Sequence, residues 1–335
     1  MLLFAALFVF PDEFAEGIGS GLSICGKVLV PSLFPFLIAA SLAGNGTLPP
    51  LIKKIFEPLS RFLFGLPADC LPAIILGQVG GYLSGAKSAQ VLCLNGTITP
   101  NQAERMLLFC VNAGIGFSVN AIGNGLLNSR EAGKILLFSL CVSSLMLGII
   151  SKVLTKSPSD DSKKQNPVTL PFSVAVVNSV STAAQSMLTA CGFVTVFSGI
   201  CAVGEKLLQS QTMCLAVTCL LEATKGCIGL AGKVSLPVIA AVCGFGGICV
   251  HMQIFSLTRE IGINLPRFYF FRLLHSVLAY AVCKITLHFR PITLPVSVTF
   301  YQNVQPFSFS APAAISLLFL CALLILDLES NRKIC

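Results

Sequence analysis

Charged residues are scarce in this chain of 335 residues: they make up 11% of it, against roughly a quarter of an ordinary soluble domain. Hydrophobic residues make up 55%, and the mean hydropathy is +0.86. So few charges do not cover a water-exposed surface, so the composition excludes a soluble globular protein and predicts an all-α, polytopic membrane protein. Tryptophan is absent, which leaves interfacial anchoring to Tyr, Phe, Lys and Arg.

Motifs of catalysis and metal binding are also missing. The chain has no H-E-x-x-H, no G-x-S-x-G, no P-loop and no C-x-x-C. We therefore expect no enzyme, no cofactor and no metal. The 15 cysteines are scattered mostly through apolar runs, where a free cysteine acts as a small hydrophobic residue. The net charge of +8 comes from single or paired basic residues without interleaved aromatics, which excludes a nucleic-acid partner and fits contact with a lipid bilayer.

One stretch, residues 71–125, organises the chain. It begins as apolar as a membrane span, but Gly80, Gly81 and Gly85 interrupt it and Lys87 follows. It becomes apolar again and is broken a second time at residues 112–116, Asn-Ala-Gly-Ile-Gly. Hydrophobic segments interrupted by glycine and polar groups are typical of the discontinuous helices that form transporter sites near the bilayer midplane.

The second half of the chain carries similar interruptions. Residues 221–226, Leu-Glu-Ala-Thr-Lys-Gly, put an acid and a base into an apolar region, and residues 244–247, Gly-Phe-Gly-Gly, precede His251 and Gln253. Matched breaks in two halves predict two internal repeats whose breaks meet in the interior. The expected division is an N-terminal repeat over 1–154, a polar linker over 155–170, and a C-terminal repeat with terminal helices over 171–335.

Segment lengths predict about ten membrane segments, some of them broken or re-entrant. A capping box of Thr99, Pro100 and Gln102 predicts a helix start. We expect a short first segment without signal-peptide features at residues 1–10 and an interfacial region at 12–28. Spans are expected at 29–46, 135–154, 189–203, 266–285 and 311–327, an interfacial helix at 47–68, and a solvated linker at 155–168.

Several features have two interpretations. Gly77, Gly81 and Gly85 are spaced by four, so they form a smooth face that either packs against a helix or brings backbone to a ligand. Lys87 inside a span indicates a site or an ion pair, unless it reaches the interface. Glu222 pairs either with Lys225 one turn away or with Lys87 across the repeats.

The other polar residues are equally open. Asn112 binds either freed backbone or a ligand, and His251 is either a satisfied core residue or part of a site. His275 and His288 indicate packing or interfacial positions. Glu104 and Arg105 are most simply a charge pair near the start of their helix.

Five motifs in order resemble those of the YlbJ-type sporulation integral membrane proteins: P-S-L-x-P-F, G-Y-P-x-G-A-K, E-A-E-R-L-L-x-F-x-N, L-E-x-T-x-G and G-F-G-G-x-x-V-H-x-Q. They are matched here by residues 31–36, 81–87, 103–112, 221–226 and 244–253. The resemblance extends over residues 10–285. Leu83 and Ile115 stand where the family has prolines.

The resemblance implies a nucleoside-recognition Gate domain, as in nucleoside transporters and ferrous-iron permeases, and a role in sporulation. For YlbJ-type proteins it implies movement of dipicolinate across a forespore membrane. The absent P-loop excludes a GTPase-linked iron permease in this chain.

Two hypotheses follow. The first is a carrier in a bacterial cell or forespore membrane for a small, anionic heterocyclic substrate, with a nucleoside as alternative substrate. The second is a scaffold or assembly factor whose glycine faces bind a partner. For the carrier, the predicted substrate-binding residues lie at the breaks: Gly81, Tyr82, Ser84, Gly85, Lys87, Asn112, Gly114, Glu222, Thr224, Gly246, Gly247, His251 and Gln253.

Overall fold

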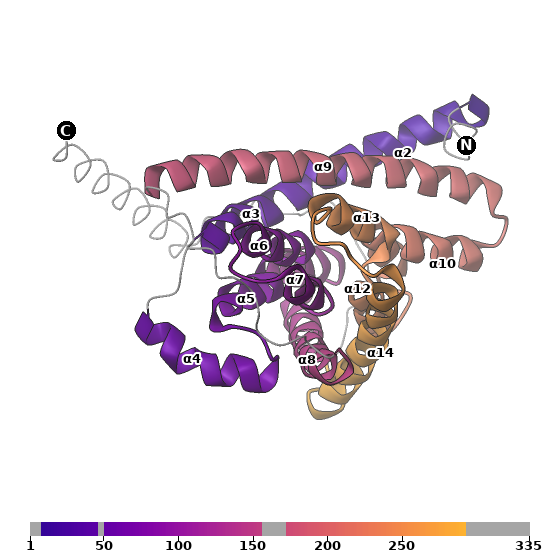
Figure 1. The fold of residues 1–335 in the computed structure, drawn as a ribbon. Coiled ribbons are helices and arrows are strands. Elements are labelled where there is room, and N and C mark those ends of the chain that lie inside the picture. The colour runs from indigo at the N-terminus through magenta and orange to yellow at the C-terminus, as the bar shows by residue number, and fades with distance from the viewer. Residues whose placement is uncertain (1–7, 46–49, 156–171, 293–335) are drawn as a thin grey trace.

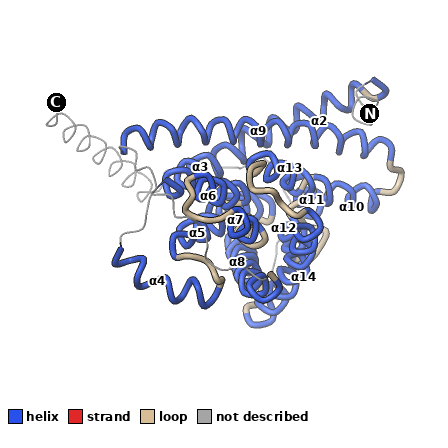
Figure 2. Tube along the Cα trace, viewed as in Figure 1, coloured by secondary structure: helices blue, strands red, loops and turns tan. Residues whose placement is uncertain are grey.

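The structure is a computed structural model that describes residues 8–45, 50–155 and 172–292. Within these ranges all regular structure is helical, and Figure 2 shows the helices joined by loops without a strand. The elements of the first half are α2 (Pro11–Ile24), η1 (Cys25–Leu29), α3 (Val30–Asn45), α4 (Pro50–Leu63), η2 (Ala68–Cys70), α5 (Leu71–Gly80), α6 (Tyr82–Leu94), α7 (Pro100–Leu107), η3 (Gly116–Leu126) and α8 (Arg130–Leu154).

The second half contains fewer and longer elements. They are α9 (Phe172–Leu207), α10 (Gln211–Leu221), α11 (Ala223–Leu230), α12 (Leu236–Phe245), α13 (Gly247–Leu257) and α14 (Leu265–Phe289). In Figure 1, α9 runs beside α2 and α3 along one side of the bundle, while α12 packs on α14 and α14 on α8. The long helices α9 and α14 therefore pack the second half of the chain against α2, α3 and α8 of the first half.

Two long helices replace segments that the sequence pattern divides. Residues 12–28 do not form a segment separate from 29–46, because α2, η1 and α3 form one helix over Pro11–Ala43. Likewise, the polar residues before 189 and the expected span at 189–203 belong to the single helix α9. Gly17 and Gly21 of α2 pack closely on Thr195, Ser198 and Gly199 of α9, whereas Ala183 and Met187, in the earlier part of α9, pack in a cluster with Leu37 of α3.

The described part contains five helices long and apolar enough to cross a membrane. A sixth span is formed if the pair Lys53–Leu63 and Ala68–Gly80, bent by 86°, counts as one. The expectation of about ten segments is not confirmed, and the two repeats and the domain boundaries stay predictions. The expected first segment at residues 1–10 falls largely outside the described residues, as do nearly all of the linker at 155–168 and the whole span at 311–327.

The predicted helix breaks are present. The expected inward segment at 71–94 is two helices, because Gly81 between α5 and α6 has φ +105°, which an L side chain rarely adopts. Gly246 between α12 and α13 has φ +90°. The third break, between α10 and α11, is an extended residue, Glu222, with φ −138° and ψ 108°.

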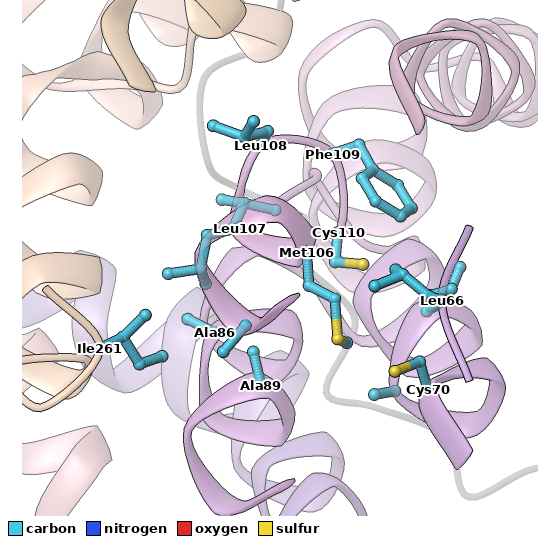
Figure 3. Close-up of a cluster of buried hydrophobic side chains, with 14 of the residues drawn as sticks. Leu66, Cys70, Ala86, Ala89, Met106, Leu107, Leu108, Phe109, Cys110 and Ile261 are labelled. Carbon is cyan, nitrogen blue, oxygen red and sulfur yellow. The ribbon is translucent and has the colours of Figure 1, made fainter. Parts of the chain in front are cut away.

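The capping box at the start of α7 is confirmed. Gln102 N–H donates to Thr99 Oγ1 over 3.2 Å, and Thr99 N–H donates to Gln102 Oε1 over 2.9 Å. Residues 106–110, at the end of α7 and just beyond it, belong to the largest apolar cluster among the described residues, and in Figure 3 they lie between Leu66 and Cys70 on one side and Ala86, Ala89 and Ile261 on the other. The short helix α7 thus places its carboxyl end inside the bundle.

The expected interfacial helix at 47–68 corresponds to α4. Its sequence is strongly amphipathic: Ile55, Leu59 and Phe62 are exposed on one face, and Glu57 forms an ion pair with Arg61 over 2.6 Å. An exposed apolar face beside a charged one suits the membrane surface. The same helix is one arm of the bent pair, so it turns the chain from that surface into α5.

Glycines on α2 provide a test of the α2–α9 packing. A Cβ on Gly17 would lie 2.7 Å from Gly199 Cα, whereas a Cβ on Gly19 would meet nothing within 4 Å. We expect Gly17→Ala to destabilise the protein by about 1–3 kcal/mol through overpacking. Gly19→Ala, two residues away, should instead stabilise it by about 0.5–1 kcal/mol through helix propensity. Thermal unfolding in detergent measures both, and equal melting temperatures for the two variants would contradict this contact.

Candidate functional site

The broken helices surround a small interior cavity of about 50 Å³. The lining comes from η1, α3, α6, η3, α9, α11 and α13, and from the breaks between them. The lining residues are Val28, Leu29, Ser32, Leu33, Gly81, Tyr82, Leu83, Gly114, Phe117, Val194, Glu222, Ala223, Thr224, Val250 and Gln253. Six of these are predicted site residues: Gly81, Tyr82, Gly114, Glu222, Thr224 and Gln253.

Tyr82 joins the breaks of the two halves. Its hydroxyl donates to the carbonyl oxygen of Cys243 over 2.5 Å, and a Cβ on Gly246 would lie 3.3 Å from its ring. Within the first half, a Cβ on Gly81 would lie 3.5 Å from the nitrogen of Gly114. The prediction that the breaks meet in the interior is therefore confirmed.

Glu222 is the acidic group of the cavity, and it is 1% exposed. Its carboxylate accepts from the backbone N–H of Thr224 over 3.1 Å and from that of Lys225 over 2.6 Å. Glu222 therefore caps the start of α11, where a negative charge is stabilised by the helix dipole. The expected pairing of Glu222 with a lysine side chain is wrong: among the described residues, no ion pair joins it to Lys87 or Lys225.

The remaining cavity walls combine a few polar groups with apolar surfaces. Thr224 and Gln253 are largely buried and line the cavity from α11 and α13. Ser32, which sequence reasoning did not select, lines it from α3, and its hydroxyl donates to Val28 O over 2.5 Å. Its position in the P-S-L-x-P-F motif was the signal for it. Phe117 adds an aromatic wall, so the cavity has polar groups on one part of its surface and apolar groups on the rest.

Lys87 lies away from this cavity. It is 6% exposed, and its Nζ donates to Gln90 Oε1 over 2.9 Å. Gln90 in turn donates to Glu260 Oε2 over 3.1 Å. The basic side chain therefore extends from α6 toward the loop after α13. The structure does not bring Lys87 to the other predicted site residues.

Asn112 holds the break that follows α7. Its Nδ2 donates to Gln78 Oε1 over 2.9 Å, and its Oδ1 accepts from the N–H of Ala113 over 2.9 Å. Gln78 donates to Ser144 over 2.8 Å, and Ser144 donates to the carbonyl of Phe109. Asn112 is fully buried and does not line the cavity. The structure thus supports the interpretation that it satisfies freed backbone.

Arg272 of α14 is the residue that sequence reasoning missed. It is fully buried, and its guanidinium donates to the carbonyls of Leu108 and Val111 over 2.6 Å each. His275 accepts a third contact, at 3.5 Å from Nη1. Arg272 therefore reaches from α14 to the C-cap residue of α7, where a cation is a suitable partner, and to a carbonyl of the break that follows this helix. An arginine within the apolar run 265–289 was the available signal.

The other predicted site residues do not line the cavity but pack near the residues that do. His251 Nε2 lies 2.8 Å from Phe245 O, and its ring packs edge-on against Phe268 and Tyr269. The structure therefore places His251 in the core, with Nε2 hydrogen-bonded and the buried Nδ1 without a hydrogen-bond partner among the described residues. Ser84, Gly85, Gly246 and Gly247 also lie outside the cavity lining: Gly85 packs on the carbonyl of Cys110, and Gly247 on the backbone of Leu221, Glu222 and Ala223.

Glu104 and Arg105 do not form a charge pair with each other. Glu104 pairs with Arg267 over 3.3 Å and accepts from the N–H of Asn264 over 3.2 Å. Arg105 donates to the carbonyl oxygens of Phe64 and Gly65. The two neighbours point to different elements, so one anchors the start of α14 and the other the end of α4.

The described residues hold no group of three or more metal-ligating side chains. The cysteines in this part of the chain are all free, as the packing interpretation predicted. Leu83 and Ile115 stand at the second position of α6 and just before η3. Proline is tolerated but not required at such helix starts, so Gly81 and Asn112 maintain the breaks without the family's prolines.

Fold and site together define a polytopic helical membrane protein whose broken helices meet around an interior cavity. No family model matches the chain, and no solved structure matches it. The chain is similar to the sporulation integral membrane protein YlbJ of Bacillus subtilis (strain 168), with 21% identity over 345 aligned positions that cover 87% of this chain and 83% of the relative. This similarity supports the resemblance to the YlbJ-type family that the motifs indicated.

Removal of the distant cap at α7 should destabilise the fold. In Arg272→Met the buried carbonyls of Leu108 and Val111 lose their donor, and each unsatisfied group costs about 1–3 kcal/mol. Arg259→Met is the control, because this arginine lies exposed in the loop after α13. We expect a much lower melting temperature for Arg272→Met only, and an unchanged value would show that Arg272 is not the cap.

Proposed function

We propose that the protein is a carrier that moves a small heterocyclic solute of the dipicolinate type across a bacterial cell or forespore membrane during sporulation. The observation that supports this most is the cavity at the meeting point of the breaks, with Glu222, Thr224 and Gln253 in its wall. Polar residues inside a membrane protein that face a cavity typically mark a substrate or ion pathway. The name of the relative supports the sporulation context.

The wall chemistry suits a flat ring with polar substituents. Phe117, Val28 and Val250 offer apolar surface for the faces of a ring, and Gln253 and Thr224 offer hydrogen-bonding groups for its edge. A cavity of about 50 Å³ has room for a few water molecules, each of which needs at least roughly 10–15 Å³. Binding of the solute therefore requires the walls to separate, and the helix breaks are where the backbone can bend.

The acid in the wall constrains the mechanism. A carboxylate on the solute would face the carboxyl group of Glu222, and two such groups in contact cannot both be ionised without a large penalty. One of them would therefore carry a proton in the bound state. We propose that the solute crosses together with a proton held at this site.

A nucleoside is the second candidate solute. Lys87 lies outside the cavity lining, and the ionisable side chain that the lining does contain is an acid. A neutral solute whose hydroxyl groups donate to Glu222 fits that chemistry without an added proton. The scaffold hypothesis has less support, because Gly77 and Gly85 pack against Cys110 of the same chain and so offer no free face to a partner.

Uptake into proteoliposomes tests the function. With labelled dipicolinate inside or outside the vesicles, we expect protein-dependent flux that unlabelled dipicolinate competes away and nucleosides do not. Competition by nucleosides alone would move the assignment to the second candidate. Absence of flux for both solutes, in protein with an intact cooperative unfolding transition, would contradict the carrier proposal.

The role of Glu222 has its own test. Glu222→Gln keeps one of the two oxygens that cap α11, replaces the other by an NH2 group, and removes the charge and the carboxyl proton. We expect a folded protein with uptake reduced about tenfold or more, which corresponds to roughly 1.4 kcal/mol or more. Glu131→Gln makes the same change at an exposed position at the start of α8 and should transport normally. Full uptake by the Glu222 variant would exclude this carboxyl group from the transport step.

A further inference from the structure

A second and larger space lies beside the cavity. It is a cleft of about 770 Å³ between α2, the end of α9, and α11. Its walls are polar and charged, with three acidic and three basic side chains among them: Glu13, Glu16, Gly17, Ser20, Ser23, Ile24, Lys27, Ala202, Glu205, Lys206, Lys225, Ile228 and Gly229. Charges of both signs on helices that are otherwise apolar indicate that water fills this cleft.

The cleft and the cavity are separated by at most about one helical turn: Lys27 and Lys225 line the cleft, and their sequence neighbours Val28 and Thr224 line the cavity. Ile24 lines the cleft and Val28 the cavity, four residues apart on the helix formed by α2 and η1. On α11, Lys225 lines the cleft and Glu222 the cavity, three residues apart. One turn rises about 5.4 Å. The separating layer is therefore thin, and it consists of the apolar cluster that contains Ile24, Val28 and Val194.

The helix that carries Ile24 and Val28 has an irregular hydrogen-bonding pattern at this layer. Cys25–Leu29 form the π-helical turn η1, which carries Lys27 of the cleft lining and Val28 and Leu29 of the cavity lining. A π-bulge inside an α-helix is rare and often occurs at functional sites, because the extra residue lets the helix shift register locally. The layer therefore has a weak point where a local shift would join cleft and cavity.

Lys225 of α11 lines the cleft opposite α2. Its Nζ donates to the carbonyl of Ser198 over 3.2 Å. Among the described residues no carboxylate lies within ion-pair distance of this ammonium, whereas Lys206 in the same cleft is paired with Glu13 over 3.3 Å. A partly buried cation that is bonded only to a carbonyl can accept a carboxylate.

Resting on the function proposed above, we propose that this cleft is the aqueous vestibule of the carrier, and that Lys225 is the group that first binds a carboxylate of the solute. The layer formed by Ile24, at the end of α2, and Val28, in the η1 turn, is the gate between vestibule and cavity. Lys87, the sequence-based candidate for such a cation, lies outside both spaces.

Thiol labelling tests the vestibule without requiring transport. Ser23 lines the cleft, while the neighbouring Leu22 is 58% exposed on another face of α2, outside the cleft lining. In proteoliposomes of mixed orientation, each face of the protein meets a membrane-impermeant methanethiosulfonate reagent in one population. Above the wild-type background, we expect Ser23→Cys to react and Leu22→Cys not to react, because a thiol in lipid stays protonated.

Two additions complete the labelling test. Dipicolinate at saturating concentration should slow labelling of Ser23→Cys severalfold. Equal labelling of the two variants, or none at either, would overturn the vestibule whether or not uptake is observed. Labelling of Ser23→Cys without any uptake would instead leave the vestibule in place and contradict the carrier proposal.

The role of Lys225 is tested by kinetics. Lys225→Met should raise the KM for dipicolinate about tenfold or more, and Lys225→Arg should recover part of that loss because the charge is kept. The control is Lys233→Met, which removes the same charge from an exposed position just beyond α11. An unchanged KM in folded Lys225→Met would overturn the role of this lysine, and labelling of Ser23→Cys would still decide on the cleft itself.

Discussion

Backbone polar groups at the helix breaks have no water to bind inside a membrane, and the rest of the structure depends on how they are satisfied. Each break is satisfied by a side chain, which comes from another element in two cases and from the break itself in the third. Arg272 binds the carbonyls at the end of α7, Tyr82 binds a carbonyl near the end of α12, and Glu222 binds the first N–H groups of α11. The breaks persist because these partners are built in, and the cavity lies where they converge.

These partners also explain the choice of residue types. An arginine presents a planar fork that binds two carbonyls at once, and a tyrosine carries its hydroxyl at the end of a long apolar ring, so it reaches across the interface between the halves. A glutamate with an extended backbone folds back onto its own helix start. At these three breaks the polar side chains hydrogen-bond to the backbone.

The membrane class could be predicted from composition, and the helix breaks from glycines such as Gly81 and Gly246. Both signals, like the capping residue Thr99, are local and need no knowledge of packing. Prediction from the sequence failed where the partners of a side chain are distant in the chain. Lys87 and Glu222 were linked by charge alone, yet each binds a group on its own side of the bundle. Glu104 and Arg105 are neighbours in sequence that serve different helices. Arg272 looked like one more residue of a span, because nothing local shows that the end of α7 lies beside it.

The length of the two helices at the edge of the bundle has a consequence for the bilayer. The helix over Pro11–Ala43 has 33 residues and that over Ser173–Leu207 has 35, which gives each a length of about 50 Å at 1.5 Å per residue. The hydrocarbon core is only about 30 Å thick, so the pair, which runs together in Figure 1, must tilt strongly or extend into the headgroups. A thinner membrane increases this mismatch. The angle between this pair and the bundle, and with it the width of the charged cleft that both helices border, is thereby coupled to the thickness of the membrane that the protein occupies.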